Sequence, residues 1–121
     1  MLKGVHHIVL FFKDTEAARD WYEKVGFVYA RGYQGMHWFK LGTTELMLHP
    51  AKEPQQCHST EIHAAVADVT AMFRHVVRQK LTPYDHKQPG VKLEEPVTRP
   101  WGDKEFELDD PEGHRWAFTQ I

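Results

Sequence analysis

The sequence has little that would stabilise a secreted protein or anchor a membrane protein. Its 121 residues include one cysteine, Cys57, which has no internal partner for a disulfide. The longest apolar run, Ile8–Phe12, is far shorter than the roughly 20 residues that span a bilayer. The first six residues contain no apolar stretch that ends at a small-residue cleavage site. We therefore expect a cytoplasmic protein with no membrane partner.

The sequence also has no large excess of positive or negative charge. The chain has 15 basic and 17 acidic residues, a formal net charge of -2, and no basic stripe, which argues against a nucleic-acid partner. It contains no nucleophile elbow, no phosphate-binding glycine loop and no CxxC pair, so acyl transfer, nucleotide hydrolysis and thiol redox chemistry have no support. With 41% hydrophobic residues, the chain can bury a core without disulfides or a structural metal.

The first half of the chain reads as a strand, a helix and three further strands. His6–Phe12 is an apolar β run, Asp14 is a candidate helix N-cap, and Gly26 suits the left-handed end of a helix. Apolar residues recur between them at helical spacing: Ala18, Trp21, Tyr22 and Val25. Three short β segments follow: Phe27–Tyr33, Met36–Leu41 and Glu45–His49.

The second half repeats this order. Glu61–Ala67 predicts a strand, and Asp68 predicts a second N-cap. An apolar helical stripe follows: Val69, Met72, Phe73, Val76 and Val77. Three further β segments are predicted, the last two after a proline-rich loop: Leu81–Lys87, Glu105–Leu108 and His114–Gln120.

Matching residues of the two halves are related by two fixed sequence separations, or offsets. Asp14 corresponds to Asp68 near the start of each half, and Leu46 corresponds to Trp116 near the end. The second offset is longer than the first, which indicates an insertion in the second half that we place mainly in the proline-rich loop. The preserved order of cap, helical stripe and strands indicates an internal duplication.

The duplication predicts an α+β fold of two tandem β-α-β-β-β units within a single domain, residues 1–121. The units span about residues 5–50 and 60–121, and a polar linker covers 51–59. Each helix would cover one face of its sheet. The other faces of the two curved mixed sheets would then form a cup that holds a small molecule.

A family resemblance covers essentially the whole chain, and three segments carry it: His7–Phe27, Arg99–Leu108 and Asp110–Trp116. The sequence resembles the vicinal oxygen chelate superfamily, which includes glyoxalase I, bleomycin-resistance proteins, fosfomycin-resistance enzymes and extradiol dioxygenases. The run Pro-Trp-Gly-x-x-Glu-Phe ahead of Asp-Pro-x-Gly is most similar to the bleomycin-resistance-like branch. The resemblance implies the same duplicated fold and a ligand held between the two units.

The resemblance also implies four metal-ligand positions, two on the first strands of the units and two on the last. They fall on His7, Met47, Glu61 and Ala117. Alanine has no donor atom, and a thioether is a poor ligand for the hard or borderline ions of this fold. His7 and Glu61 are therefore the candidate metal ligands that the sequence retains.

Strand alternation adds two histidines, since residues two apart share a face. His49 should face the cup with Met47, and His63 with Glu61, which could complete a site for zinc, nickel, manganese or iron. The alternative is that these groups only line a wet cavity. The remaining histidines are interpreted as structural, surface or packing residues: His6, His37, His58, His75, His86 and His114.

Five further residues have open roles. Trp101 lies in the region that frames the ligand groove in bleomycin-resistance-like proteins, although a packing role also fits it. Arg99 is expected to be a solvated loop arginine, with contact to an anionic ligand as the alternative. Glu105 is expected to be either an acid or base or the partner of a lysine. Trp38 and its neighbour Phe39 should face opposite sides of a strand, in an order that the sequence does not fix.

These observations favour a small-molecule-binding protein of the glyoxalase/bleomycin-resistance type, with no cofactor assigned and a small organic ligand as partner. Met47, His49, His63, Trp101 and Ala117 would line its site. The alternative is a divalent-metal-dependent lyase, isomerase, dioxygenase or thiol transferase, in which Glu61 is a ligand or a base. A third hypothesis is a regulatory domain whose cup is filled by its own side chains. A homodimer is expected in each case.

Overall fold

The structure, a computed structural model, describes residues 1–53 and 59–121. The chain separates into two compact units, Met1–Gln56 and Cys57–Ile121. Most of the predicted linker, together with Cys57 and His58, lies outside the described residues. Among the residues that are described, no helix is long and apolar enough to cross a membrane.

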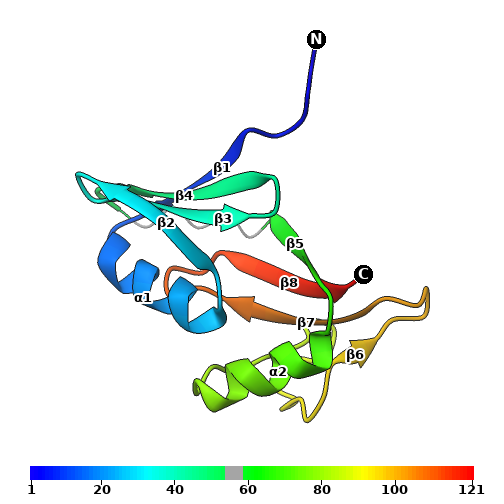
Figure 1. The fold of residues 1–121 in the computed structure, drawn as a ribbon. Helices are drawn as coiled ribbons and strands as arrows, with labels where there is room; N and C mark the ends of the chain where they lie inside the picture. Colours follow the sequence, from blue (N-terminus) through cyan, green and yellow to red (C-terminus); the bar gives the residue numbers. More distant parts are fainter. Residues whose placement is uncertain (54–58) are drawn as a thin grey trace. The chain divides into compact units, whose positions relative to one another are not determined.

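Unit one is a four-stranded mixed sheet with one helix (Figure 1). Its elements are β1 (His7–Phe12), α1 (Thr15–Val25), β2 (Val28–Tyr33), β3 (Met36–Leu41) and β4 (Thr44–Pro50). The strand order is β1-β4-β3-β2, and only the β1–β4 pair is parallel. The predicted strands and helix of this half are confirmed.

Unit two has the same arrangement (Figure 1). Its elements are β5 (Glu61–Val66), α2 (Val69–Arg78), β6 (Val97–Thr98), β7 (Lys104–Asp109) and β8 (Arg115–Gln120). The strand order is β5-β8-β7-β6, with β5 parallel to β8. His7 pairs with Glu45 in unit one, and Glu61 pairs with Arg115 in unit two, which reproduces both predicted offsets. The predicted duplication of β-α-β-β-β units is confirmed.

The predicted strand Leu81–Lys87 is wrong. Its place is taken by a single bridge between Tyr84 and Glu107, and the two-residue β6 later in the loop supplies the edge strand. Pro83 has no backbone N–H to give to a ladder. After Tyr84 the chain turns, because the Asp85 side chain accepts from the backbone N–H of Lys87.

Each helix packs against one face of its own sheet. The large buried apolar side chains alternate along the strands and recur at helical spacing, as predicted. In unit one they include Phe12, Ala18, Tyr22, Val25, Phe39, Leu46 and Leu48. In unit two they include Val69, Phe73, Val76, Phe106, Leu108, Trp116 and Phe118. Phe39 thus faces the helix, and Trp38 faces the open side of its sheet with Met47.

The two helices begin at matched caps. The Asp14 carboxylate accepts from the Ala17 backbone N–H at 3.0 Å, and the Asp68 carboxylate accepts from the Ala71 N–H at the same distance. Each cap satisfies a helix donor that otherwise has no partner in the helix.

Asp14→Ala and Asp68→Ala are each expected to lower the free energy of unfolding by about 1 kcal/mol. The midpoint of urea unfolding measures the loss. Asp20→Ala is the control, because Asp20 is an exposed residue within α1 and caps nothing. A cap variant as stable as the Asp20 variant would contradict the capping role.

Candidate functional site

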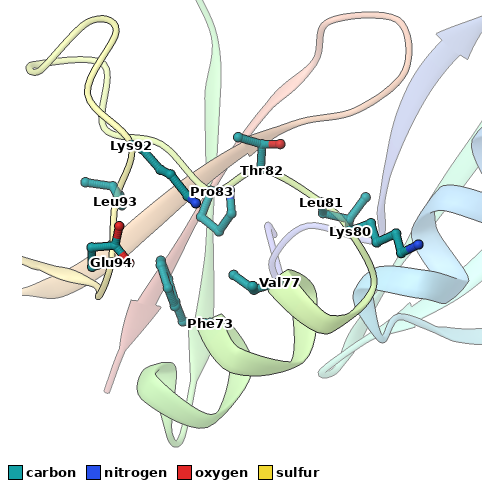
Figure 2. A pocket seen from close by; sticks show the side chains of 9 residues that line it. All are labelled: Phe73, Val77, Lys80, Leu81, Thr82, Pro83, Lys92, Leu93 and Glu94. Atoms are coloured by element: carbon teal, nitrogen blue, oxygen red, sulfur yellow. The ribbon is translucent and has the colours of Figure 1, made fainter.

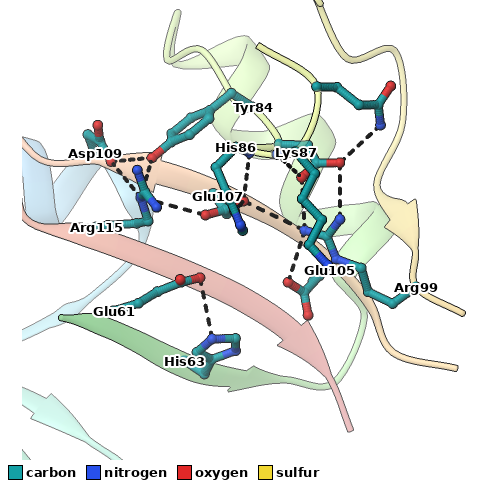
Figure 3. A network of polar contacts seen from close by, with 12 residues as sticks. Glu61, His63, Tyr84, His86, Lys87, Arg99, Glu105, Glu107, Asp109 and Arg115 are labelled. Carbon is teal, nitrogen blue, oxygen red and sulfur yellow. Dashed lines mark hydrogen bonds and ion pairs between the residues drawn. The ribbon is translucent and has the colours of Figure 1, made fainter. Parts of the chain in front are cut away.

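The polar side chains of unit two gather on the face of its sheet opposite α2 (Figure 3). Residues paired across the strands share a face, which places Glu61 and His63 of β5 with Ala117 of β8, and Ala117 with Glu107 of β7. Glu105, two residues before Glu107, lies on the same face. This surface, from here on the open face of unit two, contains the predicted residues Glu61, His63, Ala117 and Glu105.

Glu107 is the central group of the open face and is fully buried. Its Oε1 accepts from the backbone N–H of His86 at 3.0 Å and contacts the His86 ring Nδ1 at 2.6 Å. Two guanidinium groups lie slightly beyond hydrogen-bond distance, Arg99 at 3.6 Å from Oε1 and Arg115 at 3.7 Å from Oε2. Within the described part of the chain, Oε2 has no hydrogen-bond partner. One oxygen of a buried carboxylate is therefore unsatisfied, which is uncommon in a folded interior.

A buried fork holds the loop before β6 to the sheet. Arg99 donates to both oxygens of Asp85 at 3.0 Å and contacts Glu105 at 3.4 Å. Burial opposes ionisation of Asp85, but hydrogen bonds from Arg99, Gln88 and the Lys87 backbone outweigh it and lower the pKa of Asp85 to about 2. The expectation of a solvated Arg99 is wrong, since the side chain is 5% exposed and its donors are engaged with Asp85.

A second chain of contacts fixes the other side of Glu107. Arg115 donates to the Tyr84 hydroxyl at 2.9 Å, and that hydroxyl donates to the Asp109 carboxylate. Burial and the bond to Asp109 raise the pKa of Tyr84, so the phenol keeps its proton. The positive charge of Arg115 is therefore shared between Tyr84, Asp109 and Glu107.

A cavity of about 160 Å³ opens on this face. It is lined by Glu61, His63, His86, Lys87, Arg99, Trp101, Asp103 and Glu105. Trp101 is 62% exposed, its indole N–H donates to Asp103 at 3.1 Å, and the Lys87 ammonium lies 4.8 Å from its ring centre. Because ordinary ligand pockets are about 300 Å³ or larger, this cavity has room for one polar group of a ligand, beside an exposed aromatic ring.

The donor groups on the open face also fit a divalent cation. One ligand atom each from Glu61, His86 and Glu107 can be chosen so that all three lie within 4.8 Å of one another. Two carboxylates and an imidazole suit ions such as zinc and manganese. Glu61 is a predicted ligand, whereas the sequence places His86 among the surface or packing residues and does not single out Glu107.

The predicted residues of unit one share the open face of the first sheet. His7, Met47 and His49 follow from the β1–β4 register, in which Val9 pairs with Met47 and Phe11 with His49. His49 Nδ1 lies 2.7 Å from the Pro50 carbonyl, which leaves Nε2 for another partner. His6 precedes β1 and is exposed, and its Nδ1 lies 2.6 Å from that of His7.

Two other histidines have packing roles, as predicted. His37 is buried between Glu16, at 2.6 Å, and the Tyr29 hydroxyl, at 2.9 Å. His114 is buried against the Asp110 carboxylate in the turn before β8.

Unit two has a second cavity, of about 290 Å³, beside α2 (Figure 2). Its lining is Phe73, Val77, Lys80, Leu81, Thr82, Pro83, Lys92, Leu93 and Glu94. Val77 projects into it, which explains why this member of the predicted apolar stripe is 47% exposed. None of the predicted site residues lines this cavity.

Two duplicated β-α-β-β-β units with polar groups on an open sheet face define the class of fold that the sequence predicts. The model of the Glyoxalase/Bleomycin resistance protein/Dioxygenase superfamily matches residues 4–118, and the chain belongs to this superfamily. No curated protein matches the sequence.

Solved structures show the same fold. A glyoxalase family protein from Bacillus anthracis has 19% identity and a TM-score of 0.77, over 99% of this chain and 96% of that one. Lactoylglutathione lyase from Agrobacterium tumefaciens has 16% identity and a TM-score of 0.71, over 98% and 94%. TioX from Micromonospora sp. ML1 has 24% identity and a TM-score of 0.70, over 97% and 98%. At these identities the likeness concerns the fold alone.

Proposed function

We propose that the chain is a small-molecule-binding protein whose ligand contacts the open face of unit two. The observation that carries the proposal is the cavity in which Trp101, 62% exposed, stands beside Glu61, His63 and Glu105. The ring offers a flat apolar surface, and the charged groups below it fix the orientation of a polar group. Met47, His49 and Ala117 remain predicted contacts.

The charges around the cavity favour a cationic group on the ligand. Arg99, although it lines the cavity, already gives its donors to Asp85 and Glu105. Among the described residues that line the cavity, Lys87 is then the one further permanent cation beside the carboxylates of Glu61, Asp103 and Glu105. An aromatic amine or amidine fits this surplus of acceptors, with its ring against Trp101.

Amide NMR spectra recorded during titration with benzylamine test this proposal, with benzoate as the matched anion. Benzylamine should shift the Trp101 indole and Glu105 signals, and Trp101→Ala should weaken binding about fivefold, the loss of one aromatic ring contact. Glu94→Gln, at the other cavity, is the control and should bind as the parent does. Equal shifts with benzoate, or none with either probe, would contradict the proposal.

A metal-dependent lyase, isomerase, dioxygenase or thiol transferase is the second candidate. It is favoured by the donor set of Glu61, His86 and Glu107. A bound ion would polarise a carbonyl or stabilise an enediolate. Glu61 would then be a ligand or a base, and His63, with Nε2 at 3.3 Å from its carboxylate, would hold that carboxylate in position.

The reaction of lactoylglutathione lyase, assayed with zinc, nickel, manganese and iron in turn, is the first test of the second candidate. Turnover that is lost in Glu61→Gln would support it, and absence of turnover with every ion would count against this reaction. We also propose that the chain acts in the cytoplasm as a homodimer.

A further inference from the structure

Five carboxylates and two arginines lie on and around the open face of unit two. The carboxylates are those of Glu61, Asp85, Glu105, Glu107 and Asp109. Arg99 forms its short contacts with Asp85, and Arg115 forms its shortest contact with the neutral Tyr84 hydroxyl. Lys87 lies over the Trp101 ring. Negative charge therefore exceeds positive charge around Glu107.

The unsatisfied atom on this face belongs to a residue with no access to water. Glu107 is fully buried, and its Oε2 has no hydrogen-bond partner among the described residues. A buried carboxylate oxygen is costly without a partner. The Glu61 carboxylate lies within 4.8 Å of the Glu107 carboxylate in the donor triad, so a second negative group approaches the same region. A cation between the two carboxylates would give the unsatisfied oxygen a partner and would cancel the repulsion between the two negative groups.

The strand register explains how Glu107 comes to stand there. Glu107 on β7 pairs directly with Ala117 on β8, the position at which the resemblance implies a metal ligand and the chain has none. Side chains paired across neighbouring strands share a face and lie about 5 Å apart. A carboxylate on β7 can therefore reach the region that a carboxylate at position 117 would reach from β8.

We propose that unit two alone holds a divalent cation through Glu61, His86 and Glu107. In this site Glu107 takes the place of the donor that is missing at Ala117, and His86 supplies a ligand from the loop after α2. His7 is not a ligand. One imidazole with two carboxylates selects zinc, and manganese more weakly, over magnesium and calcium. The site shares Glu61 and His86 with the lining of the Trp101 cavity, but zinc binding does not require the ligand proposed for that cavity.

The alternative is a purely structural role, in which the His86–Glu107 bond only fastens the loop to the sheet. That bond occupies Oε1 and leaves Oε2 without a hydrogen-bond partner in the described part of the chain. A purely structural role therefore explains the position of Oε1 but gives no partner to Oε2.

Calorimetric titration of the untagged full chain with zinc, after removal of metals with a chelator, tests the proposal. One zinc per chain is expected, with manganese weaker and magnesium without detectable heat. Glu61→Gln and His86→Ala should each weaken zinc binding at least about tenfold. His7→Ala and His75→Ala, which change histidines outside the three, should leave the affinity unchanged. Equal loss in His7→Ala and His86→Ala, or no zinc binding by the parent, would overturn the proposal.

Line broadening by manganese locates the ion without relying on variants that could alter the fold. Amide signals of His86 and Glu107 should broaden first, at manganese concentrations below one equivalent. Broadening that begins elsewhere, or that persists unchanged in Glu61→Gln, would overturn the site. Failure of benzylamine to bind would leave this result untouched, so the two proposals can fail separately.

Discussion

Arg99→Met is expected to lower the free energy of unfolding by about 3–5 kcal/mol, because it leaves Asp85 as a buried charge without its partner. Asp85 is 2% exposed and receives both short hydrogen bonds of the Arg99 fork. Glu105 would lose its contact as well, and Glu107 would keep only Arg115 as a nearby permanent cation. Urea unfolding at neutral pH measures the loss.

Two controls separate the buried pair from general damage. The double variant Asp85→Asn, Arg99→Met removes both charges and should recover part of the loss, since no unpaired carboxylate remains at position 85. Arg115→Met should cost less, because that side chain is 33% exposed. A cost below about 1 kcal/mol for Arg99→Met, or no recovery in the double variant, would contradict the role of the fork.

The same pair should respond to acid. The folded-state pKa of Asp85, about 2, lies below its ordinary value of 3.8, so the ion pair stabilises the fold above pH 4. The stabilisation is lost as the pH falls from 4 towards 2. The difference in stability between the parent and Arg99→Met should therefore shrink over that interval.

The fold could be predicted because its signals are local. Asp14 and Asp68 cap helices through N–H groups three residues away, and the apolar stripes and strand alternation repeat in both halves. These features need only a few neighbouring residues. Glu61 is identified differently, through the family resemblance, which implies a metal ligand on the first strand of each unit.

The rest of the site depends on contacts between segments that are distant in the sequence. Asp85 meets Arg99 across 14 residues, and His86 meets Glu107 across 21. Both Asp85 and His86 lie in a turn that composition alone presents as a strand. One sequence feature predicts the position of Glu107: it lies two residues after Glu105, so both side chains lie on one face of the strand. Its burial and its pairing with Ala117 depend on the register of β7 against β8.

Ala117→Glu, which restores a carboxylate at the ligand position implied by the family resemblance, is expected to destabilise the chain by about 3–5 kcal/mol in the presence of a chelator. Ala117 is fully buried, and its strand neighbours are His63 and Glu107. The longer side chain overpacks the site, and its charge lies beside a carboxylate that already has an unsatisfied oxygen. Ala117→Gln keeps most of the added volume without the charge and should cost less. Thermal or urea unfolding measures both.

The deciding variant moves the carboxylate from one strand to the next. Glu107→Ala combined with Ala117→Glu keeps one carboxylate and one small side chain in the pair, and should recover much of the stability that Ala117→Glu loses. If the double variant is no more stable than Ala117→Glu, the two positions are not interchangeable and Glu107 has not replaced the missing donor. If it recovers, the small side chain at 117 is a requirement of the buried carboxylate at 107. The missing donor at Ala117, one of the four ligand positions implied by the resemblance, is then explained by a carboxylate that stands on the neighbouring strand.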